Sequence, residues 1–523
     1  MDEQEAGSSR VTIALIAGLV LATLVALYGL PSRHLAAAPK VALPARPMLP
    51  MVELWVSTAD RRLKLMQQPD IEMRARGSSD ADVVIDVHKT YQAMVGFGAA
   101  MTDSSAWLIQ NKLNAFQRDA LLQELYGRPP NIDLNMMRLT IGASDFSLQP
   151  YTLDDVPAGQ TDLQLEHFNV APNLLDVIPT VRQVLSIDPQ LHIVATSWSA
   201  PAWMKSNENL IGGSLLEQYE SVYADYLVKY LDAYRSHGIP IFALTLQNEP
   251  AFVPLTYPGM GMTAEQRTRL IAQYVGPKLA SRKPVTRIME WDHNWSHPEQ
   301  PSSVLSDPDA AHYIDSVAWH CYEGSPYAQN RLHRAFPQKD TYITECSGGD
   351  WASSIHGELL WFSRDLMIAG IRQWARGVIY WNLALDENHG PHFGGCATCK
   401  GMITIDSHTG AVSRNDEYYA IAHFSRFVLP GALRVGSTET DKGIANVAFQ
   451  NTVDGSIVLV LVNSNKEARP MSVADDNYRF EYTVPAQSVV TFVWSPDQGI
   501  AVIRRALWWL KGRQRPDDAD GVN

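Results

Sequence analysis

Cysteine is scarce in this chain of 523 residues, and acidic residues outnumber basic ones. The 4 cysteines are too few for the disulfide framework that stabilises small secreted domains. The 43 Lys and Arg residues against 56 Asp and Glu residues give a formal net charge of −13. Because nucleic-acid binding needs a basic face, this balance argues against that class of function. No period of about 20–50 residues recurs, which argues against a solenoid or a propeller.

The four cysteines form two groups. Cys396 and Cys399 form a single C-x-x-C in the glycine-rich loop GGCATCKG, and no matching C-x-x-C or His pair is nearby to complete a zinc site. We therefore expect no metal here and interpret the pair as a local disulfide in an oxidising compartment. Cys321 and Cys346 lie inside apolar runs, where we expect buried free thiols.

Residues 11–30 form one uncharged hydrophobic run, VTIALIAGLVLATLVALYGL. About 20 apolar residues can span a bilayer, whereas the apolar region of a signal peptide has about 7–15. We expect residues 1–36 to be a signal anchor that attaches the protein to a membrane. A cleaved signal peptide is the alternative, because AAA at 36–38 resembles a cleavage site. Both predict an extracytoplasmic catalytic body, periplasmic or secreted, after a Pro/Ala linker at 37–50.

From residue 93 to residue 432, short apolar runs alternate with longer amphipathic stretches. This alternation is typical of parallel strands joined by crossover helices. The expected strands are 93–101, 135–142, 191–199, 241–249, 287–294, 316–324, 341–349 and 377–385. Eight strands favour a closed (β/α)8 TIM barrel over the alternative, a doubly wound sheet.

The segments that flank the barrel have a different pattern. Residues 51–92 and 433–495 are rich in β-branched residues and turns, with no helical pattern between the runs. We interpret them as one antiparallel β-domain built from both flanks, and a separate C-terminal sandwich is the alternative. Residues 496–523 contain IAVIRRALWWLKGRQR, for which we expect a basic amphipathic helix that lies on lipid or packs on the protein.

The expected barrel strands mostly end on polar or aromatic side chains. In a TIM barrel these carboxyl ends converge on one face, where the catalytic groups lie. Glu249 and Glu345 end the fourth and seventh strands, and two facing carboxylates are what glycoside hydrolysis with retention requires. We expect Arg138 to keep Glu345 ionised, and burial together with the neighbouring negative charge to keep Glu249 protonated. The aromatic residues expected to offer ring faces to a sugar are Trp198, Trp203, Tyr322 and Trp381.

Eight motifs, in order along residues 90–436, resemble glycoside hydrolase family 30, the family of glucosylceramidases, and its bacterial members in particular. They are GFGAAMTDSSAW, MMRLTIGASDFS, TSWSAPAWMKSN, LQNEP, HCYEG, ITECSGG, WNLALDENHGP and HFSRFVLPGALRVG. The resemblance implies Glu249 as the acid/base and Glu345 as the nucleophile. It also implies substrate contacts: Asn248 at the sugar 2-hydroxyl, Asp145, Trp198 and Trp381 at the far hydroxyls, and Arg138 and Tyr322 as partners of the nucleophile.

We therefore expect a retaining β-glycosidase that cleaves β-glucosides, with glucosylceramide or a related glycolipid as the first candidate substrate. The alternative substrates are those of an endo-β-1,6-glucanase or a β-xylosidase of the same family. A catalytically inactive carbohydrate-binding protein is a third alternative, but such a protein would most simply lack one carboxylate. The loop GGCATCKG departs from the family pattern and leaves the leaving-group preference open. Two carboxylates suffice for this chemistry, so we expect no cofactor.

Overall fold

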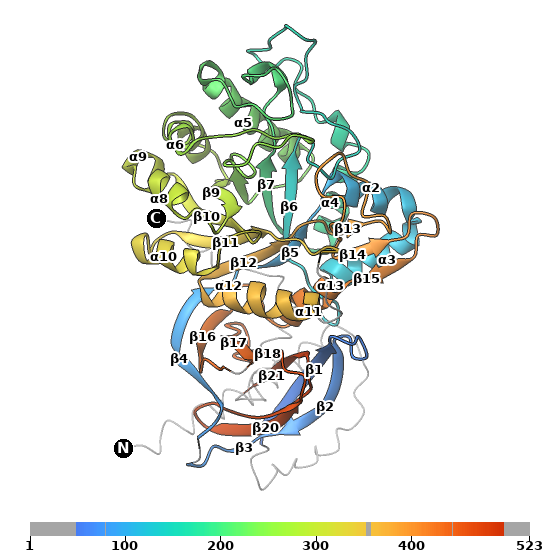
Figure 1. Cartoon of the computed structure of the whole chain (residues 1–523), viewed down its shortest axis with the longest axis vertical. Coiled ribbons are helices and arrows are strands. Elements are labelled where there is room, and N and C mark those ends of the chain that lie inside the picture. Colours follow the sequence, from blue (N-terminus) through green and yellow to red (C-terminus); the bar gives the residue numbers. More distant parts are fainter. Residues whose placement is uncertain (1–48, 79, 352–356, 442, 496–523) are drawn as a thin grey trace, which may run out of the picture. The chain divides into compact units, whose positions relative to one another are not determined.

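Eight parallel strands close into a barrel in the computed structural model (Figure 1). The structure describes residues 49–78, 80–351, 357–441 and 443–495. The barrel strands, in chain order and in order around the barrel, are β5 (Gly96–Ala100), β6 (Met136–Ile141), β7 (His192–Ser197), β8 (Ala243–Thr245), β9 (Arg287–Asn294), β10 (Ile314–His320), β11 (Asp340–Glu345) and β12 (Ala375–Tyr380). Each overlaps one of the eight expected strands, with different ends in several cases. The TIM-barrel prediction is confirmed, and the doubly wound alternative is wrong.

Helices follow the strands and lie outside the barrel (Figure 1). They are α2 (Asp103–Lys112), α3 (Ala115–Tyr126), α4 (Val177–Ile187), α5 (Glu220–Ser236), α6 (Ala264–Arg269), η4 (Leu270–Val275), α7 (Gly276–Ala280), α8 (Glu299–Leu305), α9 (Pro308–Ala311), α10 (Tyr327–Ala335), α11 (Gly357–Trp361), η5 (Phe362–Ile368), α12 (Ala369–Arg372) and α13 (Asp416–Ser425). Two of the amphipathic stretches between the expected strands, residues 215–237 and 264–281, contain α5 and the run α6–η4–α7. Thr263 caps this run by accepting a hydrogen bond from the Gln266 amide.

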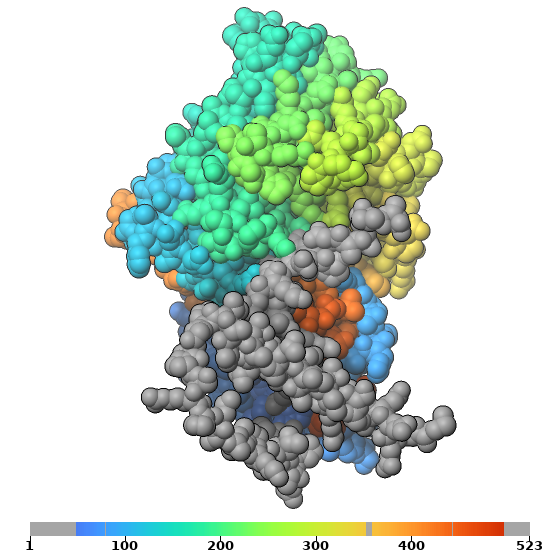
Figure 2. Space-filling model, turned by 180° about the vertical axis from the view of Figure 1, so that it is seen from behind, coloured from blue at the N-terminus to red at the C-terminus, as the bar shows by residue number. Residues whose placement is uncertain are grey.

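The two flanks of the barrel form one β-domain. β1 (Met51–Thr58) pairs with β21 (Ser488–Trp494), and β4 (Val83–Ala93) pairs with β16 (Leu433–Ser437). The full order is β2-β1-β21-β18-β17-β16-β4-β19-β20-β3, so strands from both ends of the chain lie side by side (Figure 1). In the space-filling view, blue atoms of the N-terminal flank adjoin orange-red atoms of the C-terminal flank (Figure 2). The alternative of a separate C-terminal sandwich is therefore wrong. One correction concerns direction: β19 (Arg469–Ala474) runs parallel to β4, which makes the sheet mixed rather than antiparallel.

The remaining strands of this sheet are β2 (Met66–Glu72), β3 (Arg74–Ala75), β17 (Ile444–Gln450), β18 (Ile457–Asn463) and β20 (Tyr478–Val484). A small separate sheet contains β13 (Ala384–Leu385), β14 (Ile403–Ile405) and β15 (Val412–Arg414). His423 of α13 joins barrel and β-domain, because its ring nitrogens lie 2.8 Å from Thr491 Oγ1 and 2.9 Å from Ser57 Oγ. Burial lowers the pKa of His423 to about 3, so this link is neutral.

The inside of the barrel changes from apolar to polar along the strands. The apolar layer contains Val95, Met136, Val194, Ala243, Met289, Ala318, Tyr342 and Ile379. On five of these strands, the residue two positions nearer the carboxyl end is polar: Arg138, Thr196, Thr245, His320 and Thr344. Since alternate residues of a strand point to the same side, these five polar side chains lie one layer nearer the carboxyl ends. They form the floor of the site described below.

Residues 1–48 and 496–523 lie outside the described part of the chain. The hydrophobic run 11–30, residues 37–48 of the expected linker and the expected amphipathic tail belong to them. Among the helices of the described residues, none is long and apolar enough to cross a membrane.

Candidate active site

A cavity of about 730 Å³ opens at the carboxyl ends of the barrel strands. Its walls come from the ends of several strands and from the loops that follow them. The polar and aromatic side chains that line it include Asp145, Glu249, His293, Tyr322, Glu345 and Trp381. This is the face on which TIM-barrel enzymes carry their active sites.

Glu249 and Glu345 face each other across this cavity. Glu345 ends β11, but β8 ends at Thr245, so Glu249 lies in the loop after the strand rather than at its end. The φ of Glu249 is 47°, a left-handed conformation that is uncommon outside glycine and is often found at functional sites. A carboxylate oxygen of Glu249 lies within 4.8 Å of one of Glu345. This distance fits the roughly 5–5.5 Å of a retaining pair better than the roughly 6.5–9.5 Å of an inverting pair.

Arg138 and Tyr322 hold the two oxygens of Glu345. Arg138 Nη1 forms an ion pair with Glu345 Oε2, and the Tyr322 hydroxyl donates to Oε1 at 2.9 Å. The other guanidinium nitrogen, Nη2, donates to Asn248 Oδ1 at 2.8 Å and to Asp292 Oδ2 at 2.9 Å. The side chain of Arg138 is fully buried. The guanidinium therefore orients both Glu345 and the amide of Asn248, the residue before Glu249.

Asp292 is the centre of the polar layer, although no motif in the sequence singles it out. Its Oδ2 accepts from Arg138 and from Thr245 Oγ1 at 2.7 Å, while Oδ1 accepts from Thr344 Oγ1 at 2.6 Å and lies 3.1 Å from His320 Nε2. Burial alone would raise the pKa of Asp292, but the charge of Arg138 and the hydrogen bonds of His320 and Thr344 hold it far below its usual range. Asp292 is therefore a buried permanent anion.

A bulge in β9 turns Asp292 into the barrel. Met289 points inward, so strict alternation would place Trp291 inward and Asp292 outward. The pairing of β9 with β10 shifts register between Ala318 and Trp319, and both Trp291 and Asp292 have positive φ, 79° and 57°. Such an extra residue reverses which side chains face inward.

His320 bridges the two acidic groups that flank it. Its Nδ1 lies 3.0 Å from Glu249 Oε1, and its Nε2 lies 3.1 Å from Asp292 Oδ1. Burial alone would lower the pKa of His320, but the charge of Glu345 and the hydrogen bonds to Asp292 and Glu249 raise it to about 9. Both ring nitrogens of His320 therefore face carboxylate oxygens. Nε2 carries one proton, which points to Asp292, and a second proton is shared between Nδ1 and Glu249 Oε1.

The expectation that Glu249 itself stays protonated is corrected by this arrangement. Burial would raise the pKa of Glu249, but the hydrogen bond and charge of His320, followed by His293 and Arg138, lower it below its usual value. The acidic proton is therefore held by the Glu249–His320 pair, with the imidazole as its main site in the free protein. A proton on this pair is positioned to move to a leaving group through Glu249.

We expect His320→Gln to move the basic limb of the kcat/KM profile toward lower pH. The wild-type pair should keep its proton up to about pH 9, the pKa of His320, so activity should fall only above that pH. Without the imidazole, the proton depends on Glu249 alone, a carboxyl with a lower intrinsic pKa. His423→Gln, which replaces a buried histidine far from the cavity, should leave the limb in place. An unshifted limb in His320→Gln would show that the pair does not hold the proton.

Asp145 contacts the loop that contains the C-x-x-C. Cys396 and Cys399 form the expected disulfide, and both line the cavity. Gly395 permits the close approach of this loop to Asp145. Its φ is 64°, a conformation that favours glycine, and a Cβ at this position would lie 2.4 Å from Asp145 Cβ. Burial, with the charges of Glu345 and Glu249, raises the pKa of Asp145 to about 8. Asp145 is thus protonated in much of the free protein at neutral pH.

The aromatic residues contribute unequally. Trp381 and Tyr322 line the cavity. Trp198 is 2% exposed and stacks behind Trp381, with ring centroids 5.2 Å apart. Trp203 was expected to offer a sugar-facing ring, but its indole packs against Tyr219 and donates to Asp154 Oδ2 at 3.1 Å. Trp203 supports the wall from behind instead of lining the cavity.

Within the described residues, one group of three side chains lies close enough to bind a metal ion: Glu249, His320 and Glu345. Two of them, Glu249 and Glu345, line the cavity. The Arg138 guanidinium is already bound to Glu345 and disfavours a second cation there. The donor set is therefore better suited to proton transfer and nucleophilic attack than to holding a metal.

The family assignment follows from comparison with known proteins. Residues 94–428 match the glycosyl hydrolase family 30 TIM-barrel domain, and residues 431–492 match the glycosyl hydrolase family 30 beta sandwich domain. The chain belongs to glycoside hydrolase family 30. Family 30 is a family of retaining glycoside hydrolases.

Similar family 30 proteins include two kinds of enzyme. The chain is 35% identical to the endo-1,6-beta-D-glucanase of Neurospora crassa, over 79% of this chain and 88% of that protein. It is 30% identical to the lysosomal acid glucosylceramidase of Mus musculus, over 79% of this chain and 83% of that protein. Among solved structures, the endo-beta1,6-glucanase BT3312 has a TM-score of 0.78 at 30% identity, over 85% of this chain and 99% of that one. SrfJ from Salmonella typhimurium has a TM-score of 0.80 at 28% identity, over 86% and 100%.

Proposed function

We propose that this family 30 enzyme hydrolyses β-1,6-linked glucans by double displacement, with Glu345 as nucleophile and Glu249 as acid/base. The observation that carries the substrate class is the greater similarity to an endo-1,6-beta-D-glucanase than to a glucosylceramidase, 35% against 30% identity over the same share of the chain. This difference favours the activity of an endo-β-1,6-glucanase over the hydrolysis of glucosylceramide. The chemistry is supported by the separation and surroundings of the two carboxylates.

In the first step, Glu345 attacks the anomeric carbon of the bound glucosyl unit. The glycosidic C–O bond breaks as the Glu249–His320 pair delivers its proton to the departing oxygen through Glu249. The ester between glucose and Glu345 has the α configuration. Arg138 and the Tyr322 hydroxyl, which hold the two oxygens of Glu345 before attack, orient the carboxylate for this displacement.

In the second step, the pair acts as a base. Glu249 removes a proton from a water molecule, whose oxygen attacks the same carbon from the β face and releases Glu345. The proton returns to the pair, and the product is a β-anomer. Two inversions therefore give net retention.

Substrate class is tested by comparing turnover of pustulan (a β-1,6-glucan), glucosylceramide in detergent and p-nitrophenyl β-xyloside. We expect pustulan to have the highest kcat/KM and to release oligosaccharides early in the reaction, as internal cleavage requires. Preferred cleavage of glucosylceramide or of the xyloside, with no cleavage of pustulan, would reject the proposed substrate while keeping the mechanism.

Glucosylceramide remains a second candidate because of the apolar rim of the cavity. Phe252, Leu255 and Trp351 line it and are 47%, 86% and 53% exposed. Exposed apolar side chains at the mouth of a cavity can contact a lipid chain as well as a sugar face. Leu255→Ser should weaken turnover of glucosylceramide more than that of pustulan if the rim contacts ceramide.

Asp145 is proposed to bind hydroxyls of the glucosyl unit next to the cleaved bond. We expect Asp145→Ala to lower kcat/KM for β-glucosides by about 10²-fold or more, because sugar hydroxyls that lose their hydrogen bonds to this buried carboxyl group cost about 1–3 kcal/mol each. Asp154→Asn, a change of another buried carboxylate that does not line the cavity, is the matched control and should have a small effect. Equal activity of Asp145→Ala and the parent would show that the sugar binds elsewhere.

We further propose that the catalytic body is extracytoplasmic and attached to a membrane by residues 11–30. The hydrophobic run of this segment and the two disulfides support the proposal. The full chain should stay with membranes after an alkaline wash, and a chain lacking residues 1–36 should be released. If the full chain is instead released in a form that has lost its N-terminal segment, residues 1–36 are a cleaved signal peptide.

A further inference from the structure

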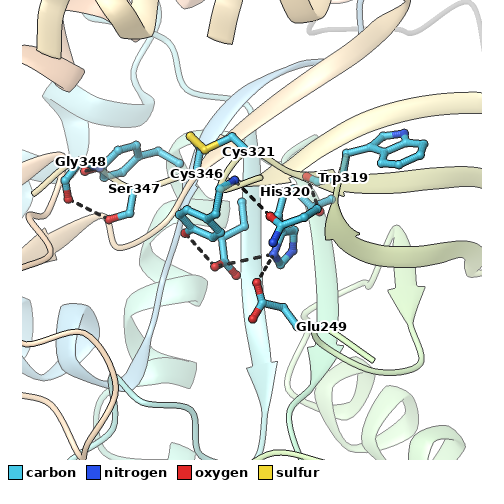
Figure 3. The surroundings of a disulfide bond; sticks show 12 residues. Glu249, Trp319, His320, Cys321, Cys346, Ser347 and Gly348 are labelled. Atoms are coloured by element: carbon cyan, nitrogen blue, oxygen red, sulfur yellow. Dashed lines mark hydrogen bonds and ion pairs between the residues drawn. A yellow bond between two sulfur atoms is a disulfide. The ribbon is translucent and has the colours of Figure 1, made fainter. Parts of the chain in front are cut away.

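Cys321 and Cys346 form a disulfide directly beside the catalytic carboxylates, which corrects the expectation of free thiols. Figure 3 shows this disulfide next to His320 and Glu249. The sequence could not reveal the bond, because the two cysteines are 25 residues apart and directly follow different strands. They meet only because β10 and β11 are neighbours in the barrel, where the two Cα atoms lie 5.3 Å apart.

The two cysteines adjoin the residues that hold the nucleophile. Cys346 directly follows Glu345, and Cys321 lies between His320 and Tyr322. The Tyr322 hydroxyl donates to Glu345 Oε1, and His320 Nδ1 lies 3.8 Å from the same oxygen. One covalent bond therefore links the chain next to Glu345 to the chain between His320 and Tyr322, whose side chains lie beside the Glu345 carboxylate.

The backbone pairing between these strands is irregular at this place. Trp319 is opposite Ile343, but His320 is opposite Glu345, so Thr344 is an extra residue in β11. A bulge of this kind interrupts the regular ladder of hydrogen bonds and bends the strand that contains it. Both strands end with the pair His320 and Glu345. The disulfide links the next residue of each strand and so fixes the register at the point where the ladder stops.

We propose that the Cys321–Cys346 disulfide is a positioning element for Glu345, in addition to any contribution to stability. The inference rests on the proposed role of Glu345 as nucleophile. Attack on an anomeric carbon requires close alignment of the carboxylate, and a misplacement of about 1 Å can lower a rate by about 10²-fold. Cys346 is fully buried and Cys321 is partly buried, and the bond between them acts on the strand ends.

The test compares Cys321→Ala/Cys346→Ala with Leu461→Ala in the full chain. Leu461 is fully buried in the separate core of the β-domain, so its truncation lowers stability without touching the cavity. Each protein is titrated with 2,4-dinitrophenyl 2-deoxy-2-fluoro-β-glucoside, well below its melting temperature. The first-order labelling constant ki reports attack by the nucleophile, and the dissociation constant Ki reports binding.

We expect ki and kcat of the double cysteine variant to fall about 10–100-fold, with Ki changed by no more than a few-fold and the far-UV circular dichroism unchanged. Leu461→Ala should keep ki near that of the parent while its Tm falls. If the double variant keeps ki and loses only Tm, the disulfide is purely structural and the inference is wrong.

A second measurement applies if the double variant does not fold. Wild-type enzyme is treated with a phosphine reductant under native conditions, and alkylation with peptide mapping gives the fraction reduced at Cys321 and Cys346. We expect ki to fall in proportion to that fraction, and an unchanged ki in reduced, folded enzyme would overturn the inference. Failure of the proposed function would give a different result, because the label in wild-type protein would then be found on a residue other than Glu345.

Discussion

Replacement of Glu345 by Gln should lower turnover of every β-glucoside by roughly 10⁵–10⁶-fold, the size of loss seen when the nucleophile of a covalent mechanism is removed. The amide has nearly the same shape as the carboxylate but cannot form the ester intermediate. Arg138 would keep its ion pair with Asp292, so we expect the variant to stay folded. The measurement is kcat with an activated aryl glucoside, alongside circular dichroism and Tm.

Azide provides the control for this prediction. In Glu345→Ala the space left by the carboxylate can admit azide, which should attack from the α face and give an α-glycosyl azide from an activated β-glucoside. A variant that retained more than about a hundredth of the parent activity would show that another group attacks, since residual activity of that size is too large for loss of a nucleophile.

Glu249→Ala should show a loss that depends on the leaving group. For substrates with poor leaving groups such as pustulan, we expect a fall of about 10²–10⁴-fold, the usual contribution of general acid catalysis. For 2,4-dinitrophenyl glucoside, which needs no proton to depart, formation of the glycosyl-enzyme should be nearly normal and its hydrolysis slow. Azide should speed this second step and give a β-glycosyl azide.

The configuration of the azide product separates the two roles. An α-azide from Glu345→Ala and a β-azide from Glu249→Ala are expected, because azide attacks the free substrate in one variant and the glycosyl-enzyme in the other. The assignment of Glu249 would be wrong if its variant lost both substrate types equally or gave the α product.

Local patterns predicted the barrel and the position of its two carboxylates. Alternating short apolar runs and amphipathic stretches correctly indicated eight strands, and the rule that strand ends converge brought Glu345 and Glu249 to one face. The flanks were correctly assigned to one β-domain because β-branched runs without helices have few alternatives to a sheet. These features depend on the composition of short segments and on general rules of chain topology.

Features that depend on bulges or on pairs of distant residues could not be predicted in the same way. Asp292 faces inward only because β9 contains a bulge, which the alternation of its sequence does not show. The proton of Glu249 depends on His320, 71 residues away in sequence. The Cys321–Cys346 bond depends on the register of two neighbouring strands. In each case the deciding interaction is tertiary.

Covalent trapping tests the central claim most directly, namely that Glu345 is the nucleophile of a retaining mechanism. Wild-type enzyme is incubated with 2,4-dinitrophenyl 2-deoxy-2-fluoro-β-glucoside, and the adduct is located by intact mass and peptide mapping. The account predicts one fluoroglucosyl group per chain, attached to Glu345 in the peptide that contains TECSGG. An adduct on another residue, or turnover to the α-anomer without any adduct, would contradict it.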